Sequence, residues 1–93
     1  MGLFRNVAVK GEATASISWG YYTAASLRTW TISKVGGQWS LRAGIDRADP
    51  FKLRQAPLLF TAPGPGGYFC FPIRSLTLGK DHLAAQLGPP EAG

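Results

Sequence analysis

Few side chains in this chain of 93 residues could carry out covalent chemistry. There is one histidine, one cysteine and five carboxylates. His82 follows Asp81 directly, but neighbouring side chains on a strand point to opposite faces, so the two would not form a catalytic pair there. Cys70 lies among aromatic residues with no nearby cation to favour a thiolate, which indicates a structural, buried thiol. We therefore expect no enzymatic activity.

Metal and cofactor sites are not expected either. Zinc sites need three or four nitrogen or sulfur ligands at close spacing, and one His with one Cys cannot supply them unless carboxylates or a second subunit contribute. The stretch 63–67, with three glycines and two prolines, has the composition of a phosphate-binding loop. Pro63 and Pro65 lack the N–H groups such a loop uses, however, and a strand follows instead of a helix. We interpret it as a hairpin loop.

Basic and aromatic side chains interleave after the middle of the chain, and this is the strongest functional signal. Small β-barrels bind nucleic acid with such mixtures, using cations for phosphates and rings for stacking on bases. The candidate site for nucleic acid or another acidic partner comprises Arg28, Arg42, Arg47, Phe51, Lys52 and Arg54. Arg42, Arg47, Lys52 and Arg54 are expected to form one electropositive surface. The alternative is a solvated rim, with Phe51 and Leu53 covering the barrel end.

Tyr21 and Tyr22 form a second candidate surface. Adjacent residues of a strand point to opposite faces, so one tyrosine should be exposed beside small polar residues, as at protein-binding surfaces. The alternative is ordinary packing with the hydroxyl groups in solvent. The interface candidates for a protein partner, or for a homodimer, are therefore Tyr21 and Tyr22.

The stretch 28–47 contains the best-defined pair of strands. Gly36 and Gly37 stand between two alternating runs, which is typical of a two-residue hairpin turn with positive φ at both positions. This register pairs Val35 with Gln38 and Trp30 with Ala43. One face is then apolar, with Trp30, Ile32, Trp39, Leu41, Ala43 and Ile45; the other is polar, with Thr29, Thr31, Ser33, Gln38, Ser40 and Arg42.

Shorter runs predict the remaining strands. We expect strands over 3–9, 13–22, 58–62 and 68–73, with a bend at Gly20, a link over 23–26 and a five-residue loop over 63–67. Asp49 should cap a turn or two of helix that begins at Pro50. Residues 74–87 fit either a hairpin or a short helix over 82–87, and the alternation of Leu83, Ala85 and Leu87 favours the hairpin.

These strands predict a small all-β domain, an SH3-like or related partly open barrel of about six to seven short antiparallel strands. Residues 1–87 form the single domain, and residues 88–93 a mobile, Pro-rich end. The expected core is Ile17, Trp19, Trp30, Ile32, Leu41, Ile45, Phe60 and Phe71. A net charge of +5 favours an acidic partner, nucleic acid or a nucleoprotein complex. No membrane association is expected, and the unpaired cysteine favours the cytoplasm.

The C-terminal quarter gives a general resemblance. Residues 71–78, a short turn and residues 83–90 are similar to the ends of small all-β accessory proteins of phages and mobile genetic elements. That resemblance implies a non-enzymatic virion component, or an inhibitor of a host defence complex of the anti-CRISPR kind acting in the host cytoplasm. It assigns a role to no individual residue.

Overall fold

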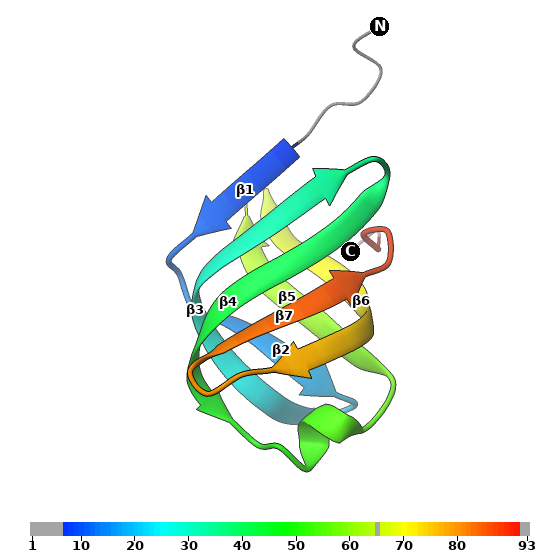
Figure 1. Cartoon of the computed structure of the whole chain (residues 1–93). Coiled ribbons are helices and arrows are strands. Elements are labelled where there is room, and N and C mark those ends of the chain that lie inside the picture. Colours follow the sequence, from blue (N-terminus) through cyan, green and yellow to red (C-terminus); the bar gives the residue numbers. More distant parts are fainter. Residues whose placement is uncertain (1–6, 65, 92–93) are drawn as a thin grey trace, which may run out of the picture.

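The computed structural model describes residues 7–64 and 66–91, which fold almost entirely into antiparallel strands (Figure 1). The strands are β1 (Val7–Gly11), β2 (Ala15–Trp19), β3 (Tyr22–Val35), β4 (Gln38–Ala48), β5 (Leu58–Gly64), β6 (Gly67–Leu78) and β7 (His82–Leu87), with a 3-10 helix, η1 (Lys52–Arg54), between β4 and β5. Their order in the sheet is β1-β3-β2-β5-β6-β7-β4, and β3 also pairs with β4. This last pairing closes β2 to β7 into a six-stranded barrel, with β1 added to β3. The predicted small all-β barrel is confirmed. No helix in the described part of the chain is long and apolar enough to cross a membrane.

The β3–β4 hairpin has the predicted register next to its turn. Val35 pairs with Gln38, and the pairing continues in step to Thr31 and Arg42. Gly36 and Gly37 have φ values of 58° and 81°, as a tight turn with positive φ at both central positions requires.

Beyond that point the hairpin contains two irregularities that the alternation did not predict. The first lies between Arg28 and Thr31, so Trp30 does not pair with Ala43 as expected, although both side chains are buried. Thr29 has φ of 50°, which is rare for a β-branched residue, and a Cβ at Gly44 would crowd its hydroxyl oxygen. The first irregularity is one extra residue in β3, and the second, between Ser26 and Leu27, is one extra residue in β4. The two shifts in register therefore cancel. The original register returns where Ser26 pairs with Arg47, and it continues to Ala25 and Ala48.

Two turns differ from the predictions. The strand expected over 13–22 ends at Trp19, and Trp19 pairs with Tyr22 across a two-residue turn in which Gly20 has φ of 61°. The residues expected to link two strands, 23–26, therefore belong to β3. The five-residue loop expected over 63–67 is also wrong, because the β5–β6 pairing continues to Gly64 and Gly67. Gly64 permits this extension, since a Cβ there would overlap the Phe69 ring.

The C-terminal hairpin is confirmed. Leu78 of β6 pairs with Leu83 of β7, and Leu83, Ala85 and Leu87 face the core while the residues between them are exposed, as expected. The backbone N–H groups of Gly88 and Glu91 then donate to the carbonyl oxygens of Pro72 and Cys70, both at 2.8 Å. That residues 88–93 are mobile stays a prediction.

The first strand, β1, continues to Gly11, two residues past the predicted end at residue 9. Gly11 pairs with Trp30 and lies directly against its ring, because a Cβ at Gly11 would overlap the indole. Residues 3–6 of the predicted first strand lie outside the described residues.

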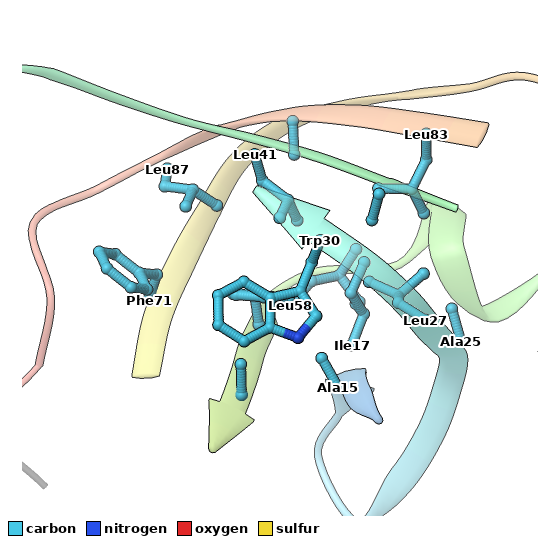
Figure 2. Close-up of a cluster of buried hydrophobic side chains, with 14 of the residues drawn as sticks. Ala15, Ile17, Ala25, Leu27, Trp30, Leu41, Leu58, Phe71, Leu83 and Leu87 are labelled. Atoms are coloured by element: carbon cyan, nitrogen blue, oxygen red, sulfur yellow. The ribbon is translucent and has the colours of Figure 1, made fainter. Parts of the chain in front are cut away.

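Trp30 lies in the middle of the core. Figure 2 shows its indole between Phe71 and Leu87 on one side and Ile17 and Leu27 on the other. Its Nε1–H donates to the carbonyl oxygen of Ala13 at 3.0 Å, so the polar atom of the ring is satisfied. Six of the eight predicted core residues are buried, namely Ile17, Trp30, Ile32, Leu41, Phe60 and Phe71. Trp19 and Ile45 pack against this core and are only partly buried.

Candidate functional site

Aromatic side chains gather at one end of the barrel. Figure 1 shows that the β2–β3 turn and η1 lie together at this end, away from β1 and the β3–β4 turn. The Trp19 ring lies 5.8 Å from the Tyr22 ring and 6.5 Å from the Phe51 ring, measured between centroids. Phe51 is 66% exposed, Tyr22 59% and Tyr21, in the turn, is fully exposed. We call Trp19, Tyr21, Tyr22 and Phe51 the aromatic end.

Asp49 and Leu53 position η1 beside these rings. Oδ1 of Asp49 accepts hydrogen bonds from the backbone N–H groups of Phe51 at 3.0 Å and Lys52 at 3.3 Å, so its side chain caps this segment as predicted. The predicted helix start is wrong, however, because the helix is a single 3-10 turn that begins at Lys52 and not at Pro50. The Asp49 N–H donates to the Ala24 carbonyl at 2.8 Å and so ties the segment to β3. Leu53 is buried in the core. Leu53 therefore covers the barrel end, as the alternative prediction expected. Phe51, the other residue of that alternative, stays largely exposed with its ring beside Trp19.

Lys52 links η1 to the tyrosine of β3. Its Nζ lies 5.4 Å from the centroid of the Tyr22 ring and 3.4 Å from Oδ2 of Asp49. The hydrogen bond from the Lys52 backbone N–H holds the pKa of Asp49 below its ordinary value, against a smaller opposing effect of desolvation, and the Lys52 ammonium and the Phe51 N–H act in the same direction. The Asp49 carboxylate is therefore ionised at neutral pH, and the Lys52 side chain is held in place by two contacts.

A shallow groove runs beside the aromatic end. It has a volume of about 330 Å³ and is bounded by β3, the end of β4 and η1. The lining residues are Thr23, Ala24, Ala25, Ser26, Arg47, Ala48, Asp49 and Lys52. Arg47 and Lys52 place two cations at this groove. Neither Arg47 nor Arg54, an exposed residue of η1, forms an ion pair with another described residue.

The structure places the other predicted cations elsewhere. The Arg28 guanidinium pairs with Asp46 at 2.9 Å, and the two side chains are 65% and 49% exposed. Arg42 projects from β4 between Thr31 of β3 and Ala84 of β7. It lines a separate depression of about 450 Å³ that also includes His82. Of the four cations expected on one surface, Arg47 and Lys52 share the groove, Arg54 lies on the adjoining segment and Arg42 lies outside it.

The tyrosines are arranged differently from the prediction. Tyr21 and Tyr22 were expected as neighbours on one strand with one side chain exposed. Tyr21 instead occupies the β2–β3 turn and Tyr22 begins β3, so both are exposed. The alternation assigned Trp19 to the core. Its ring instead packs between the core and the exposed rings of Tyr22 and Phe51.

The groups capable of covalent chemistry are not among the residues that line the groove beside the aromatic end. Nδ1 of His82 is 2.8 Å from Oδ1 of Asp81, so the prediction that these two side chains point to opposite faces is wrong. Asp81 lies in the turn before β7, where the alternation of a strand does not apply, and both side chains are largely exposed. Cys70 is partly buried in β6. No three metal-ligating side chains cluster within the described residues. The aromatic end and its groove offer cations for an anionic group and rings for stacking, which is the chemistry of binding.

Comparison of the chain with protein-family models, with curated proteins and with solved structures found no match.

Proposed function

We propose that this protein is a non-enzymatic binding module for nucleic acid, and that it binds through the aromatic end and the adjoining groove. One observation carries the proposal: Arg47 and Lys52 line a single groove next to the exposed rings of Tyr22 and Phe51. These residues come from two segments about 25 residues or more apart in the chain, and the barrel brings them together. Cations beside exposed rings are what proteins use to hold a phosphate backbone and its bases.

The three cations of this region differ in how much attraction they retain for a phosphate. Lys52 is partly neutralised, because the Asp49 carboxylate lies 3.4 Å from its Nζ. Arg47 and Arg54 have no such partner among the described residues, so their charge is available to an incoming anion. An arginine can also bind a phosphate with two parallel hydrogen bonds. We therefore assign the main phosphate contacts to Arg47 and Arg54, with Lys52 in support.

A salt titration tests this assignment. Binding of a fluorescent single-stranded oligonucleotide is measured by anisotropy at several salt concentrations, for the wild type and for an Arg47→Ala, Arg54→Ala double variant. Each phosphate contact adds about 0.7 to the slope of log affinity against log salt on a single strand, so losing two should flatten the slope by about 1.4.

The matched control removes two charges from the other end of the barrel. Lys10→Ala with Lys34→Ala removes two positive charges, as the Arg47→Ala, Arg54→Ala variant does. Lys10 lies on β1 and Lys34 near the end of β3. This variant should keep the wild-type slope. An equal loss in both double variants would show that only net charge matters, and no binding by folded wild type at low salt would reject the nucleic-acid function.

A protein partner is the second candidate, and the exposure of Tyr21, Tyr22 and Phe51 favours it. Rings of this type dominate the binding energy of many protein interfaces. The partner could be a second copy of this chain, or the surface of a nucleoprotein complex, including a host defence complex of the CRISPR kind. Sedimentation equilibrium tests the homodimer: a dimer that Phe51→Ala dissociates supports this candidate, and a monomer at all concentrations excludes self-association.

A further inference from the structure

The ring of Phe51 is exposed and yet held in position. The preceding cap fixes its backbone, since the Phe51 N–H donates to Oδ1 of Asp49 at 3.0 Å. The Phe51 carbonyl accepts hydrogen bonds from the Arg54 N–H at 3.2 Å and from Nε2 of Gln55 at 3.0 Å. The ring meets Trp19 in an edge-on arrangement, with an interplanar angle of 77°. Two thirds of the residue nevertheless faces solvent.

Tyr22 is not equally open to a ligand. The Lys52 ammonium lies over its ring, and the Trp19 ring packs beside it at a tilt of 35°. Tyr22 therefore serves to position Lys52 at the groove. Of the two rings that contact Trp19, Phe51 is the one without a cation over it, and it is next to Lys52 in the chain.

A rigid exposed ring beside a cationic groove distinguishes single strands from duplexes. The base faces of a single strand are free to stack on a protein ring while its phosphates meet the cations. In a duplex the base faces are covered by neighbouring base pairs, and only the phosphates and groove edges are presented. The groove cations would attract both forms, whereas the ring would add affinity only for the single strand.

We propose that the protein prefers single-stranded nucleic acid, with a base stacked on Phe51 and the adjacent phosphates held by Arg47 and Arg54, with Lys52 in support. This inference rests on the proposed nucleic-acid function and specifies its ligand. Tyr21, fully exposed in the neighbouring turn, is placed to contact a further nucleotide of the same strand.

The test compares two ligands and two substitutions of the same ring. Affinities for an oligothymidylate of about 12 nucleotides, within the range of site sizes for small barrels, and for a duplex of equal length are measured at one low salt concentration. Phe51→Leu keeps an apolar side chain but removes the π-face. It should weaken single-strand binding by about fivefold or more, the lower end of measured stacking contributions. Duplex binding should stay unchanged, and Phe51→Trp should match or exceed the wild type on the single strand.

Tyr68→Leu is the control for a general loss of exposed aromatic surface. Tyr68 is 74% exposed and lies on the β5–β6 hairpin next to its turn, away from η1, so its replacement should change neither affinity. Circular dichroism verifies the fold of each variant. Equal weakening on both ligands, or no weakening on either, would overturn the stacking inference while leaving the nucleic-acid function in place. Wild type that binds neither ligand would instead reject the function on which this inference rests.

Discussion

The Lys52 ammonium lies 5.4 Å from the centroid of the Tyr22 ring, so a side chain of η1 covers the first residue of β3. The backbone repeats this link, because the Asp49 N–H donates to the Ala24 carbonyl. The connection after β4 is therefore attached to β3 and forms one continuous surface with it. The β3–β4 pairing places Arg47 at the candidate site, and these two contacts hold η1 beside it.

The Lys52–Tyr22 contact should be measurable as a coupling energy. A double-mutant cycle with Lys52→Met and Tyr22→Leu, followed by urea unfolding, cancels the loss of the Asp49 ion pair because that loss occurs in both tyrosine backgrounds. Cation–π contacts at exposed sites contribute about 0.5–1 kcal/mol, and we expect a coupling in that range. A coupling indistinguishable from zero would mean that the two side chains do not interact in solution.

Trp30 should be among the residues most sensitive to truncation. It is 3% exposed and packs edge-on against Phe60 and Phe69. Trp30→Ala should lower the free energy of unfolding by about 3–5 kcal/mol, through lost burial and the cavity that remains. Urea unfolding measures this, with Tyr68→Ala as an exposed aromatic control. An unchanged midpoint for Trp30→Ala would show that the core is assigned to the wrong face of the hairpin.

Gly11 should tolerate a side chain only when Trp30 is absent. A Cβ at Gly11 would overlap the indole ring, so Gly11→Ala should cost about 1–3 kcal/mol as an overpacked contact. In a Trp30→Leu background the same substitution should cost much less, because the overlapping ring is gone. Thermal or urea unfolding of the four proteins gives the comparison. Equal costs in both backgrounds would indicate that β1 does not lie on Trp30.

The cap formed by Asp49 should make stability dependent on acid. The pKa of Asp49 lies below its ordinary value of 3.8 in the folded protein, chiefly because of the hydrogen bond from the Lys52 N–H. The unfolded chain therefore takes up the proton first. The stabilisation is complete above the unfolded pKa and is lost as the pH falls through the lower folded pKa. On acidification below about pH 4 the stability of wild type should thus fall more steeply than that of Asp49→Asn, which keeps an oxygen acceptor but cannot ionise, and the advantage of wild type over the variant should shrink. Parallel stability curves for the two proteins would contradict this account of the cap.

Local turn chemistry explains which parts of the fold were predictable. Gly36 and Gly37 form the predicted turn, since both adopt positive φ between two alternating strands. Gly20 also adopts positive φ in a two-residue turn, but the sequence did not predict that turn. The apolar alternation continues through it to Tyr21 and so indicates an uninterrupted strand. Thr29 could not have been anticipated, because its positive φ depends on space left by Gly44 on the neighbouring strand.

The candidate site was predictable in its residue types but not in its assembly. The basic residues after β4 and the tyrosines after Trp19 were identified as two separate surfaces. If the hairpin register is continued from Ala25 and Ala48 to the start of β3, Tyr22 falls opposite Phe51. That register predicts that the two surfaces are one. The alternation instead places Tyr22 at the end of the preceding strand, which separates it from the hairpin. Alternation also could not show that Arg28 is paired with Asp46, since an ion pair depends on side-chain geometry.

Nucleic acid should bind at the aromatic end and its groove, and NMR can locate the binding surface directly. Isotopically labelled protein is titrated with an oligothymidylate at low salt, and the changes in backbone amide chemical shift are mapped on the structure. We expect the largest changes over residues 20–26 and 47–54, with little change in β1 and at the β3–β4 turn around Gly36. Changes centred on the β3–β4 turn, on the depression beside Arg42, or spread evenly over all basic residues would contradict the claim.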